Sequence, residues 1–375
     1  MKNVFDFDYN NSILSASNSI LKHYGIQTYH KTHPFLDEKL KSNKKNVILL
    51  ILDGMGIDLV NKNMKPTSFI RKNIEQTIYS VFPPTTAAAT ISWHSAMSPW
   101  ESGWIGWACY YPQYNQIVEN FRNTNCYTGE KLQTPFPIED IIKYETIYEK
   151  ITKHNPNVEY HKIFPISIEK DGVNSFEEMC ERIVSATKSN NKQKIISAYW
   201  NEPDHTTHIY GTNNNAVKNI LADIDNTLKQ MYSELEDSIV IVSADHGQTD
   251  VKEIQLNDFP SICETFCIPP TLEARFVSFY IKEGMNKVFL TEFNKYFANE
   301  FKLYTKEEFI QSGLLGSGKM HRQIPDFIGD YVVIAIGDKN LRYTTGERPQ
   351  KQNKGDHAGI SEEEMLIPLI ILEKD

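Results

Sequence analysis

The chain has 375 residues, enough for one large domain or for a core domain with an insertion. Its 48 acidic and 39 Lys and Arg residues give a net charge of −9, and hydrophobic residues make up 40%, as in ordinary soluble globular proteins. This acidic balance argues against a protein that coats nucleic acid through its phosphates. It still allows one small anionic substrate, because bound divalent metal ions can reverse the local charge.

The cysteines and the apolar segments exclude two further classes. Five scattered cysteines are not a disulfide framework: Cys109, Cys126, Cys180, Cys263 and Cys267. A metal site on the last two is an alternative, although no second Cys or His pair lies near them. The first residues carry acids and no long apolar stretch, so they are not expected to be a signal peptide. The longest apolar runs, such as residues 47–52, fall well short of the roughly 20 residues of a membrane span. We therefore expect a cytoplasmic protein without a membrane anchor.

Apolar periodicity predicts alternating helices and strands along the chain. A helix is predicted over residues 11–24 and a second one, with a clear apolar stripe, over residues 216–235. Continuous apolar runs are typical of strands buried on both faces, as in parallel sheets, and they occur at residues 47–52, 195–200, 238–243 and 365–372. This alternation predicts an α/β fold with a largely parallel central sheet flanked by helices.

Two segments interrupt this pattern. Residues 104–165 are rich in Tyr, Asn and Pro and show no clean period. Residues 270–340 contain their own strand, helix and strand, predicted at 275–281, 287–299 and 331–336. We expect residues 270–340 to form a small inserted α+β cap, and residues 1–269 and 341–375 to form the core.

Acidic and histidine side chains gather just after the predicted strands. Asp53 follows the first run, Asp204 and His208 follow the second, and Asp245 and His246 follow the third. In open α/β sheets ligands bind at this edge, and Asp oxygens with neutral His nitrogens suit Zn²⁺, with Mn²⁺ possible. Each cluster alone is also compatible with a simple turn or a surface histidine.

The segment that begins at Asp53 also allows an alternative hypothesis, a dinucleotide-binding loop, which the sequence supports less well. The residues Gly54-Met55-Gly56 resemble part of a dinucleotide-binding fingerprint, but Leu59 stands where the third glycine belongs.

A pair of threonines opens a predicted helix. Thr85 and Thr86 follow Phe82-Pro-Pro and precede an alanine-rich segment. A hydroxyl at this position is commonly a helix N-cap. Alternatively it is a nucleophile, since a helix N-terminus stabilises both an alkoxide and an incoming phosphate.

Taken together, these motifs resemble the alkaline phosphatase superfamily, and in particular its nucleotide pyrophosphatase/phosphodiesterase family. The matching elements occur in one order over residues 47–372: the strand ending in Asp53-Gly, Phe82-Pro-x-x-Thr86, Pro99-x-x-x-Gly103, Glu202-Pro-Asp204-x-x-x-His208, Asp245-His246-Gly247 and Gly355-x-His357. The resemblance implies an alkaline phosphatase-like core.

The resemblance also implies roles for seven residues. One divalent metal ion would be held by Asp204, His208 and His357. A second would be held by Asp53, Asp245 and His246, together with the nucleophile Thr86, for which Thr85 is the alternative. The implied reaction is hydrolysis of a phosphate ester or nucleotide through a phospho-threonine intermediate, with the two metal ions clamping the attacking and leaving oxygens.

Two positions depart from the family pattern. Trp107 stands where the family often has an Asn that contacts phosphate, and Thr85 stands where it often has Lys. We expect the missing contacts to come from the Ala87 amide or from cap residues, with Lys319, His321 and Arg322 as candidates. Most aromatic residues near the threonines are expected in the core, although one or two could stack on a nucleobase: Trp93, Trp100, Trp104, Trp107, Tyr110 and Tyr111.

The leading hypothesis is a metal-dependent phosphodiesterase or nucleotide pyrophosphatase. A phosphomonoesterase or phosphomutase of the same superfamily is the alternative enzyme, and an inactive metal-bearing binding module is the alternative from another class. A sulfatase is disfavoured because the sequence has no Cys-x-Pro-x-Arg motif. A membrane phosphoethanolamine transferase is disfavoured by the lack of apolar spans.

Overall fold

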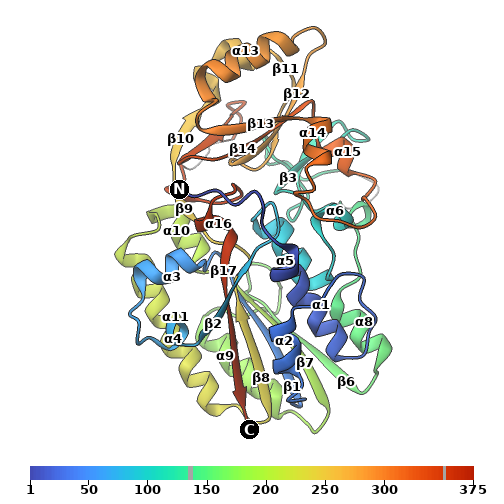
Figure 1. Ribbon diagram of the computed structural model, residues 1–375, viewed down its shortest axis with the longest axis vertical. Helices are drawn as coiled ribbons and strands as arrows, with labels where there is room; N and C mark the ends of the chain where they lie inside the picture. Colours follow the sequence, from blue (N-terminus) through green and yellow to red (C-terminus); the bar gives the residue numbers. More distant parts are fainter. Residues whose placement is uncertain (134–137, 349–351) are drawn as a thin grey trace.

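The computed structural model describes residues 1–133, 138–348 and 352–375. Within these residues a six-stranded sheet forms the centre of the molecule (Figure 1). In spatial order its strands are β2 (Ile74–Tyr79), β17 (Leu366–Lys374), β8 (Ser238–Ser243), β1 (Asn46–Leu52), β7 (Gln193–Trp200) and β6 (Val158–Ile163). The four strands predicted from continuous apolar runs are thereby confirmed.

The register of the sheet brings several strand ends level. Strands β8, β1, β7 and β6 are parallel neighbours. Leu52 of β1 lies opposite Trp200 of β7, and Ile51 lies opposite Ser243 of β8. Strand β17 runs antiparallel to both of its neighbours, β8 and β2. The central sheet is therefore mixed and not wholly parallel, because an apolar run predicts a buried strand but not its direction.

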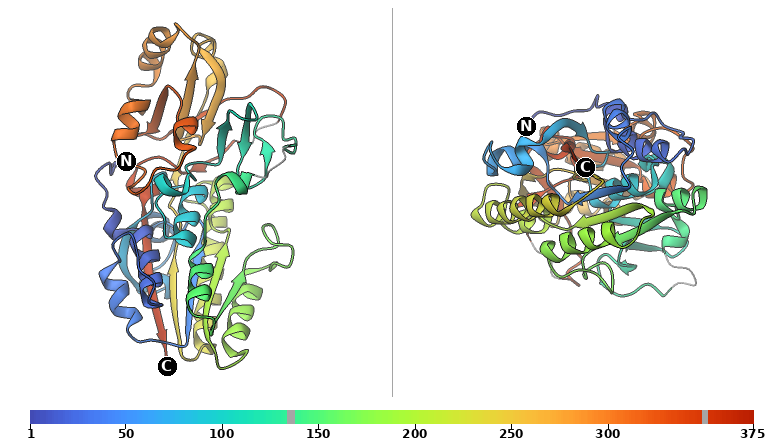
Figure 2. Two further views of the ribbon diagram at one scale, coloured as in Figure 1. Left: turned by 90° about the vertical axis from the view of Figure 1, so that its right-hand side faces the viewer. Right: turned by 90° about the horizontal axis from the view of Figure 1, so that it is seen from below.

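Helices cover both faces of the central sheet (Figure 2). Helix α1 (Ile13–His23) packs against α2 (Pro34–Leu40), α5 (Thr86–Ser95) and α8 (Ile147–His154). On the other face α9 (Phe176–Lys188) packs against α11 (Asn215–Glu234), which also contacts α3 (Ile57–Asn63) and α4 (Phe69–Lys72). The predicted helices at 11–24 and 216–235 correspond to α1 and α11.

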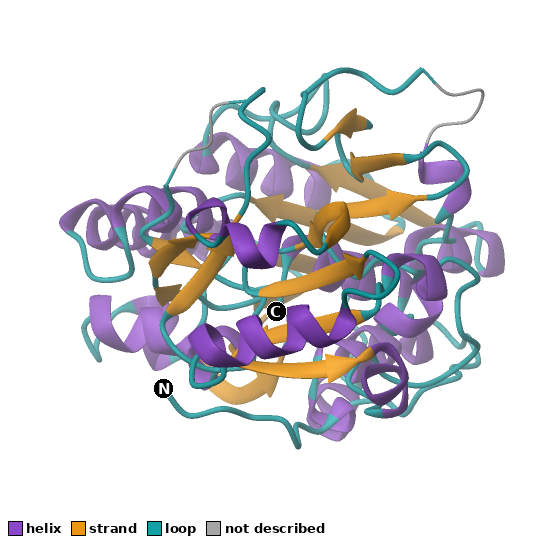
Figure 3. Cartoon of the chain, turned by 90° about the horizontal axis from the view of Figure 1, so that it is seen from above, coloured by secondary structure: helices purple, strands orange, loops and turns teal. Residues whose placement is uncertain are grey.

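A second sheet lies above the central one (Figure 1), and Figure 3 shows the chain from that side. Among the described residues it has seven antiparallel strands: β13 (Phe301–Thr305), β14 (Tyr331–Ala335), β12 (Phe276–Ile281), β11 (Phe266–Leu272), β3 (Ala108–Tyr111), β4 (Gln116–Glu119) and β5 (Thr124–Asn125). Helix α13 (Asn286–Phe297) packs on it through phenylalanines. The predicted strand, helix and strand correspond to β12, α13 and β14. The sheet also includes β13, β11 and strands β3–β5, which belong to the segment without a clean period.

The remaining elements are short. They are η1 (Tyr9–Asn11), α6 (Pro99–Ser102), α7 (Ile138–Ile141), α10 (Asp204–Tyr210), β9 (Thr249–Asp250), β10 (Lys252–Gln255), η2 (Leu256–Asp258), α12 (Pro260–Cys263), α14 (Lys306–Gln311), α15 (Ile324–Phe327), β15 (Lys339–Arg342), β16 (Gly355–Asp356) and α16 (Glu362–Met365). None of the helices in the described ranges combines the length and apolar character needed to cross a bilayer.

A buried apolar cluster joins the two sheets. It contains Phe82 from the segment before α5, Ala87 from the start of α5, and Leu272 and Phe276 from the second sheet. The phenyl rings of Phe82 and Phe276 meet edge to face with centroids 5.0 Å apart. The helix that begins with Thr86 is therefore packed against both sheets.

Candidate metal centre and nucleophile

Five chain segments reach one edge of the central sheet. Strands β1, β7 and β8 end level there, so the segments that follow them bring Asp53, Asp204 and Asp245 to the same place. Strand β17 begins at this edge because it runs the other way, and strand β2 ends beside it. The segment before β17, with His357, and the segment after β2, with Thr86, therefore arrive at the same edge.

Three of these side chains form a fully enclosed group. His246 Nε2 lies 3.3 Å from Asp53 Oδ1 and 3.6 Å from Asp245 Oδ2. The other ring nitrogen, Nδ1, lies 3.0 Å from the Gly247 carbonyl oxygen, to which it donates when it carries the proton. Asp245 Oδ1 accepts the backbone N–H groups of Gly54 and His246. Asp53 Oδ1 and Asp245 Oδ2 are buried and accept no hydrogen bond from the described residues. Such orphaned oxygens beside an imidazole nitrogen suit a divalent cation.

Glycines allow the loops that carry these residues to close on one another. Gly54, directly after Asp53, has a φ of +71°. A Cβ on Gly56 would lie 2.5 Å from Gly247 Cα, and one on Gly247 would lie 2.1 Å from the Glu363 carbonyl oxygen. Gly54 is therefore required by the backbone conformation of the turn, and Gly56 by the close approach of the Gly247 backbone.

The two threonines at the start of α5 have different surroundings. Thr86 is partly exposed, and its Oγ1 lies 3.2 Å from His246 Nε2. Thr85 is buried and occupies the N-cap position, but its hydroxyl makes no capping bond. It donates instead to Glu273 Oε1 at 2.7 Å. Of the two hydroxyls, that of Thr86 therefore faces the His246 group.

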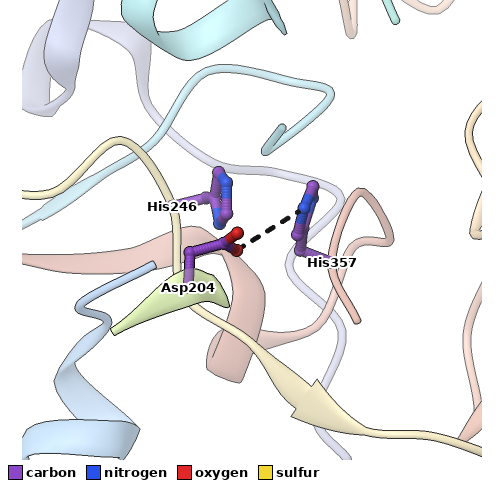
Figure 4. A group of neighbouring side chains, drawn as sticks. All are labelled: Asp204, His246 and His357. Carbon is purple, nitrogen blue, oxygen red and sulfur yellow. Dashed lines mark ion pairs between the residues drawn. The ribbon is translucent and has the colours of Figure 1, made fainter. Parts of the chain in front are cut away.

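The second predicted set adjoins the first (Figure 4). Asp204 Oδ1 lies 3.3 Å from His208 Nε2, one helical turn along α10, and 3.8 Å from His357 Nε2. His208 Nδ1 is 2.8 Å from the Gly355 carbonyl oxygen, which leaves Nε2 available as a ligand when Nδ1 carries the proton. The rings of His246 and His357 stack with centroids 3.9 Å apart. Asp204, His246 and His357 offer atoms that lie within 4.8 Å of one another.

Electrostatics at the sheet edge reflect three carboxylates in a buried space. Burial, and then the charges of Asp204 and Asp245, raise the pKa of Asp53 well above its usual range. Burial alone would raise the pKa of Asp204, but the charge and hydrogen bond of His208 together with the charges of His357 and His246 outweigh it and lower that pKa. Burial lowers the pKa of His357 well below the ordinary value. The raised pKa of Asp53 means that the crowded carboxylates resist ionisation in this buried space, and a divalent cation held by these side chains would favour their charged form.

Two further residues support the carboxylates and were not singled out by any motif. The Tyr199 hydroxyl, at the end of β7, donates to Asp53 Oδ2. The Gln248 amide donates to Asp204 Oδ1. The position of Gln248, two residues after His246, could have indicated a role near the site. Tyr199 lies within an apolar run, so nothing in the sequence indicated its contact with Asp53.

Asp356 is a third supporting group, present in the Gly355-x-His357 motif but given no role from sequence. Its Oδ2 accepts from the Asn340 amide at 2.7 Å and from Arg342 Nη2 at 3.3 Å. With His208 and His357 it forms another group of possible ligands.

Glu273 is a fourth residue that sequence reasoning missed. It lies between β11 and β12, and its Oε1 accepts both the Thr85 hydroxyl and the Trp107 backbone N–H, each at 2.7 Å. Burial raises the pKa of Glu273 to about 7, although both of these bonds lower it. Thr85 and Trp107 are the two positions that depart from the family pattern, and one carboxylate oxygen joins them.

The candidate cap residues and the aromatic residues differ in their exposure to solvent. Lys319 and Arg322 are exposed, and the His321 ring packs against Gly103, where a Cβ would lie 2.5 Å from His321 Nδ1. Of the six aromatic residues, three are buried in the core: Trp93, Trp104 and Tyr111. The other three, Trp100, Trp107 and Tyr110, are partly exposed, so half of the set is buried in the core. The groups of possible metal ligands found among the described residues contain no cysteine.

The fold, with two Asp/His groups and a helix-initial threonine at one sheet edge, defines the class of the protein as the alkaline phosphatase superfamily. Within it, the family model described as type I phosphodiesterase / nucleotide pyrophosphatase matches residues 47–359, and the chain belongs to this family. The resemblance inferred from the motifs is therefore confirmed. A search of curated proteins found no match.

Solved structures of ectonucleotide pyrophosphatase/phosphodiesterase 5 share the fold. The murine protein is similar over 86% of this chain and 87% of its own, with a TM-score of 0.61 and 16% identity. The human protein has the same coverage, a TM-score of 0.62 and 15% identity. An inactive threonine-to-alanine variant of the murine protein, in complex with AMP, has a TM-score of 0.60 and 16% identity.

Proposed function

We propose that this protein is a metal-dependent phosphodiesterase or nucleotide pyrophosphatase in which Thr86 is the nucleophile. The observation that carries the proposal is the position of Thr86 Oγ1, 3.2 Å from His246 Nε2 and next to the orphaned oxygens of Asp53 and Asp245. Family membership supports the hydrolase class.

The donor sets fit two divalent metal ions. Asp53, Asp245 and His246, with Thr86, would hold one, and Asp204, His208 and His357 the other. When bound, such ions lower the pKa of a coordinated hydroxyl and offset charge on the leaving oxygen. Mixed His and Asp ligands suit Zn²⁺, with Mn²⁺ as the alternative.

The chain itself supplies the nucleophile and its orientation. The Thr86 oxygen attacks phosphorus, so that a bond from Thr86 to phosphorus forms and the bond from phosphorus to the leaving group breaks. Water then attacks the phospho-threonine, releasing phosphate or a phosphate monoester and restoring the hydroxyl. The backbone N–H groups of Thr86 and Ala87, at the start of α5, have no hydrogen-bond partner among the described residues. They are free to donate to the phosphate oxygens.

We propose a nucleotide or a related small phosphate ester as substrate. A structural neighbour has been solved in complex with AMP, which supports a nucleotide-sized ligand. Residues 270–340, as a cap domain inserted into the core of residues 1–269 and 341–375, would supply contacts to the part of the substrate beyond the phosphate.

Two chromogenic substrates test the proposal. Purified protein is loaded with Zn²⁺ or Mn²⁺, its metal content is measured, and it is assayed with bis-p-nitrophenyl phosphate and p-nitrophenyl phosphate in parallel. Preference for the diester is the expected result. Preference for the monoester would replace the proposal with a phosphomonoesterase or phosphomutase. Turnover of neither substrate by metal-loaded protein would point to a binding module.

A further inference from the structure

Glu273 places a carboxyl group near the proposed nucleophile, and this group carries a negative charge above its pKa of about 7. Its Oε1 is 2.7 Å from the hydroxyl of Thr85, the residue directly before Thr86. The same oxygen is 2.7 Å from the Trp107 backbone nitrogen. The donors are the Thr85 hydroxyl at the start of α5 and the Trp107 N–H in the segment after α6. These two hydrogen bonds hold the Glu273 side chain in one place.

Among the described residues, no Lys, Arg or His side chain forms an ion pair with this carboxylate. Arg342 is the basic residue whose charge acts on Glu273, but it already pairs with Asp356 at 3.3 Å and with Glu253 at 3.8 Å. The second oxygen of Glu273, Oε2, has no hydrogen-bond partner in the described ranges, and the residue is partly exposed. The Glu273 carboxylate is therefore fixed by the hydrogen bonds to Oε1, while Oε2 has neither a hydrogen-bond donor nor a basic partner among the described residues.

The net charge of the proposed site determines how the Glu273 carboxylate would affect a bound phosphate group. Three aspartates and a Thr86 alkoxide would carry four negative charges, which two divalent ions would balance. Glu273 lies outside those ligand sets, and its carboxylate, held beside Thr85, would add one further negative charge near a phosphate bound at Thr86. Like charges brought together in a partly desolvated site cost free energy, and a dianion suffers this more than a monoanion.

We propose that Glu273 is a specificity-determining residue that disfavours dianionic phosphomonoesters and thereby favours monoanionic phosphodiesters at Thr86. This inference rests on the proposed function, and it deepens that function by naming the charge of the preferred phosphate group.

The substitution Glu273→Gln tests the charge while keeping the anchor. The amide oxygen still accepts from Thr85 and Trp107, so positioning is retained. At about pH 8 a phosphate monoester is a dianion, because its second pKa is about 6. We measure kcat/KM for p-nitrophenyl phosphate, for bis-p-nitrophenyl phosphate and for p-nitrophenyl methylphosphonate, which has the size of the monoester but a single charge.

The expected result is a selective gain for the dianion. In the glutamine variant kcat/KM for p-nitrophenyl phosphate should rise about tenfold relative to both singly charged substrates, equivalent to roughly 1.4 kcal/mol. Binding of inorganic phosphate to the metal-loaded protein, measured by calorimetry, should tighten by a similar factor. Glu273→Ala, a second neutral variant, should shift the substrate ratio in the same direction.

A matched control removes a carboxylate elsewhere. Asp225 on α11 is buried and accepts the backbone N–H groups of Phe69 and Ile70, at 2.9 and 2.6 Å. Asp225→Asn should leave the substrate ratio unchanged.

Two results would overturn the inference. One is that the glutamine variant has the same ratio of kcat/KM values and the same affinity for phosphate as the wild type. The other is an equal loss of kcat/KM with all three substrates, which would make Glu273 a positioning residue only. If wild-type protein turned over no substrate, the proposed function would fail, while the phosphate-binding comparison would still test the charge of Glu273.

Discussion

Arg275 and Glu364 form a bidentate ion pair in the interior of the molecule. Arg275 Nε lies 2.7 Å from Glu364 Oε1 and Nη2 lies 2.9 Å from Oε2, and both side chains are fully buried. Arg275 precedes β12 in the second sheet, whereas Glu364 lies in α16, between His357 and β17. The pair therefore fastens the second sheet to the segment that delivers His357.

Removing one partner of this pair should destabilise the fold. Arg275→Met leaves the Glu364 carboxylate buried without its counter-charge, and we expect a loss of about 3–5 kcal/mol in the free energy of unfolding. Urea denaturation measures it. The control is Arg182→Met, because Arg182 pairs with Glu178 on the surface of α9, where a change of less than about 1 kcal/mol is expected. Equal effects of the two substitutions would contradict the role given to the buried pair.

Substitution of the proposed nucleophile should abolish turnover without removing metal. We expect Thr86→Ala to lower kcat by at least about a thousandfold, because the attacking oxygen is lost. Metal content, measured by mass spectrometry, should stay near that of the wild type, since Asp53, Asp245 and His246 remain. Thr90→Ala, one turn along the same helix, is the control and should retain activity. Substantial activity in the Thr86 variant would implicate Thr85 or direct attack by water.

Loss of a proposed ligand should reduce metal occupancy as well as activity. Asp204→Ala removes the carboxylate that faces both His208 and His357, so the proposed ligand set loses its only acidic member. We expect about one metal ion fewer per chain, measured on dialysed protein. His161→Ala, a partly exposed histidine on β6, is the control. Unchanged metal content in the Asp204 variant would remove the basis for this ligand set.

Acid should destabilise the metal-free protein through His94. Burial lowers the pKa of His94 in α5 to about 3, against 6.5 in the unfolded chain. A histidine with a depressed folded pKa contributes stability above pH 6.5 that is lost as the pH falls toward 3, because the unfolded chain takes up the proton first. Between pH 7.5 and 4.5 this amounts to about 2–3 kcal/mol.

The glutamine substitution isolates this contribution. Urea unfolding of wild type and His94→Gln at both pH values should show a smaller loss in the variant, whose amide does not titrate. Parallel losses in the two proteins would assign the acid sensitivity to other groups.

The central part of the fold follows from sequence because its strands are long and buried on both faces. Strands β1 and β8 are apolar along nearly their whole length, so their burial and the position of their ends could be predicted. Asp53, Asp245 and His246 come directly after those ends, which is why the structure brings them together. Their roles as metal ligands stay predictions.

The second sheet and the supporting residues could not be predicted in the same way. Strands β3 and β4 have four residues each and β5 has two, too few to establish an alternating pattern. Glu273 acquires its partners across 188 residues to Thr85 and 166 to Trp107. Contacts of that sequence separation depend on how the two sheets pack, which no local spacing encodes.

The reversed direction of β17 affects when the site is complete during synthesis. Because this strand begins beside the other strand ends, residues 355–365 join the group only after the segments with Asp53, Thr86, Asp204 and Asp245 have left the ribosome. A product that stops before residue 355 would carry Asp53, Thr86, Asp204 and Asp245 without His357. Such a product would therefore lack one member of the proposed second ligand set.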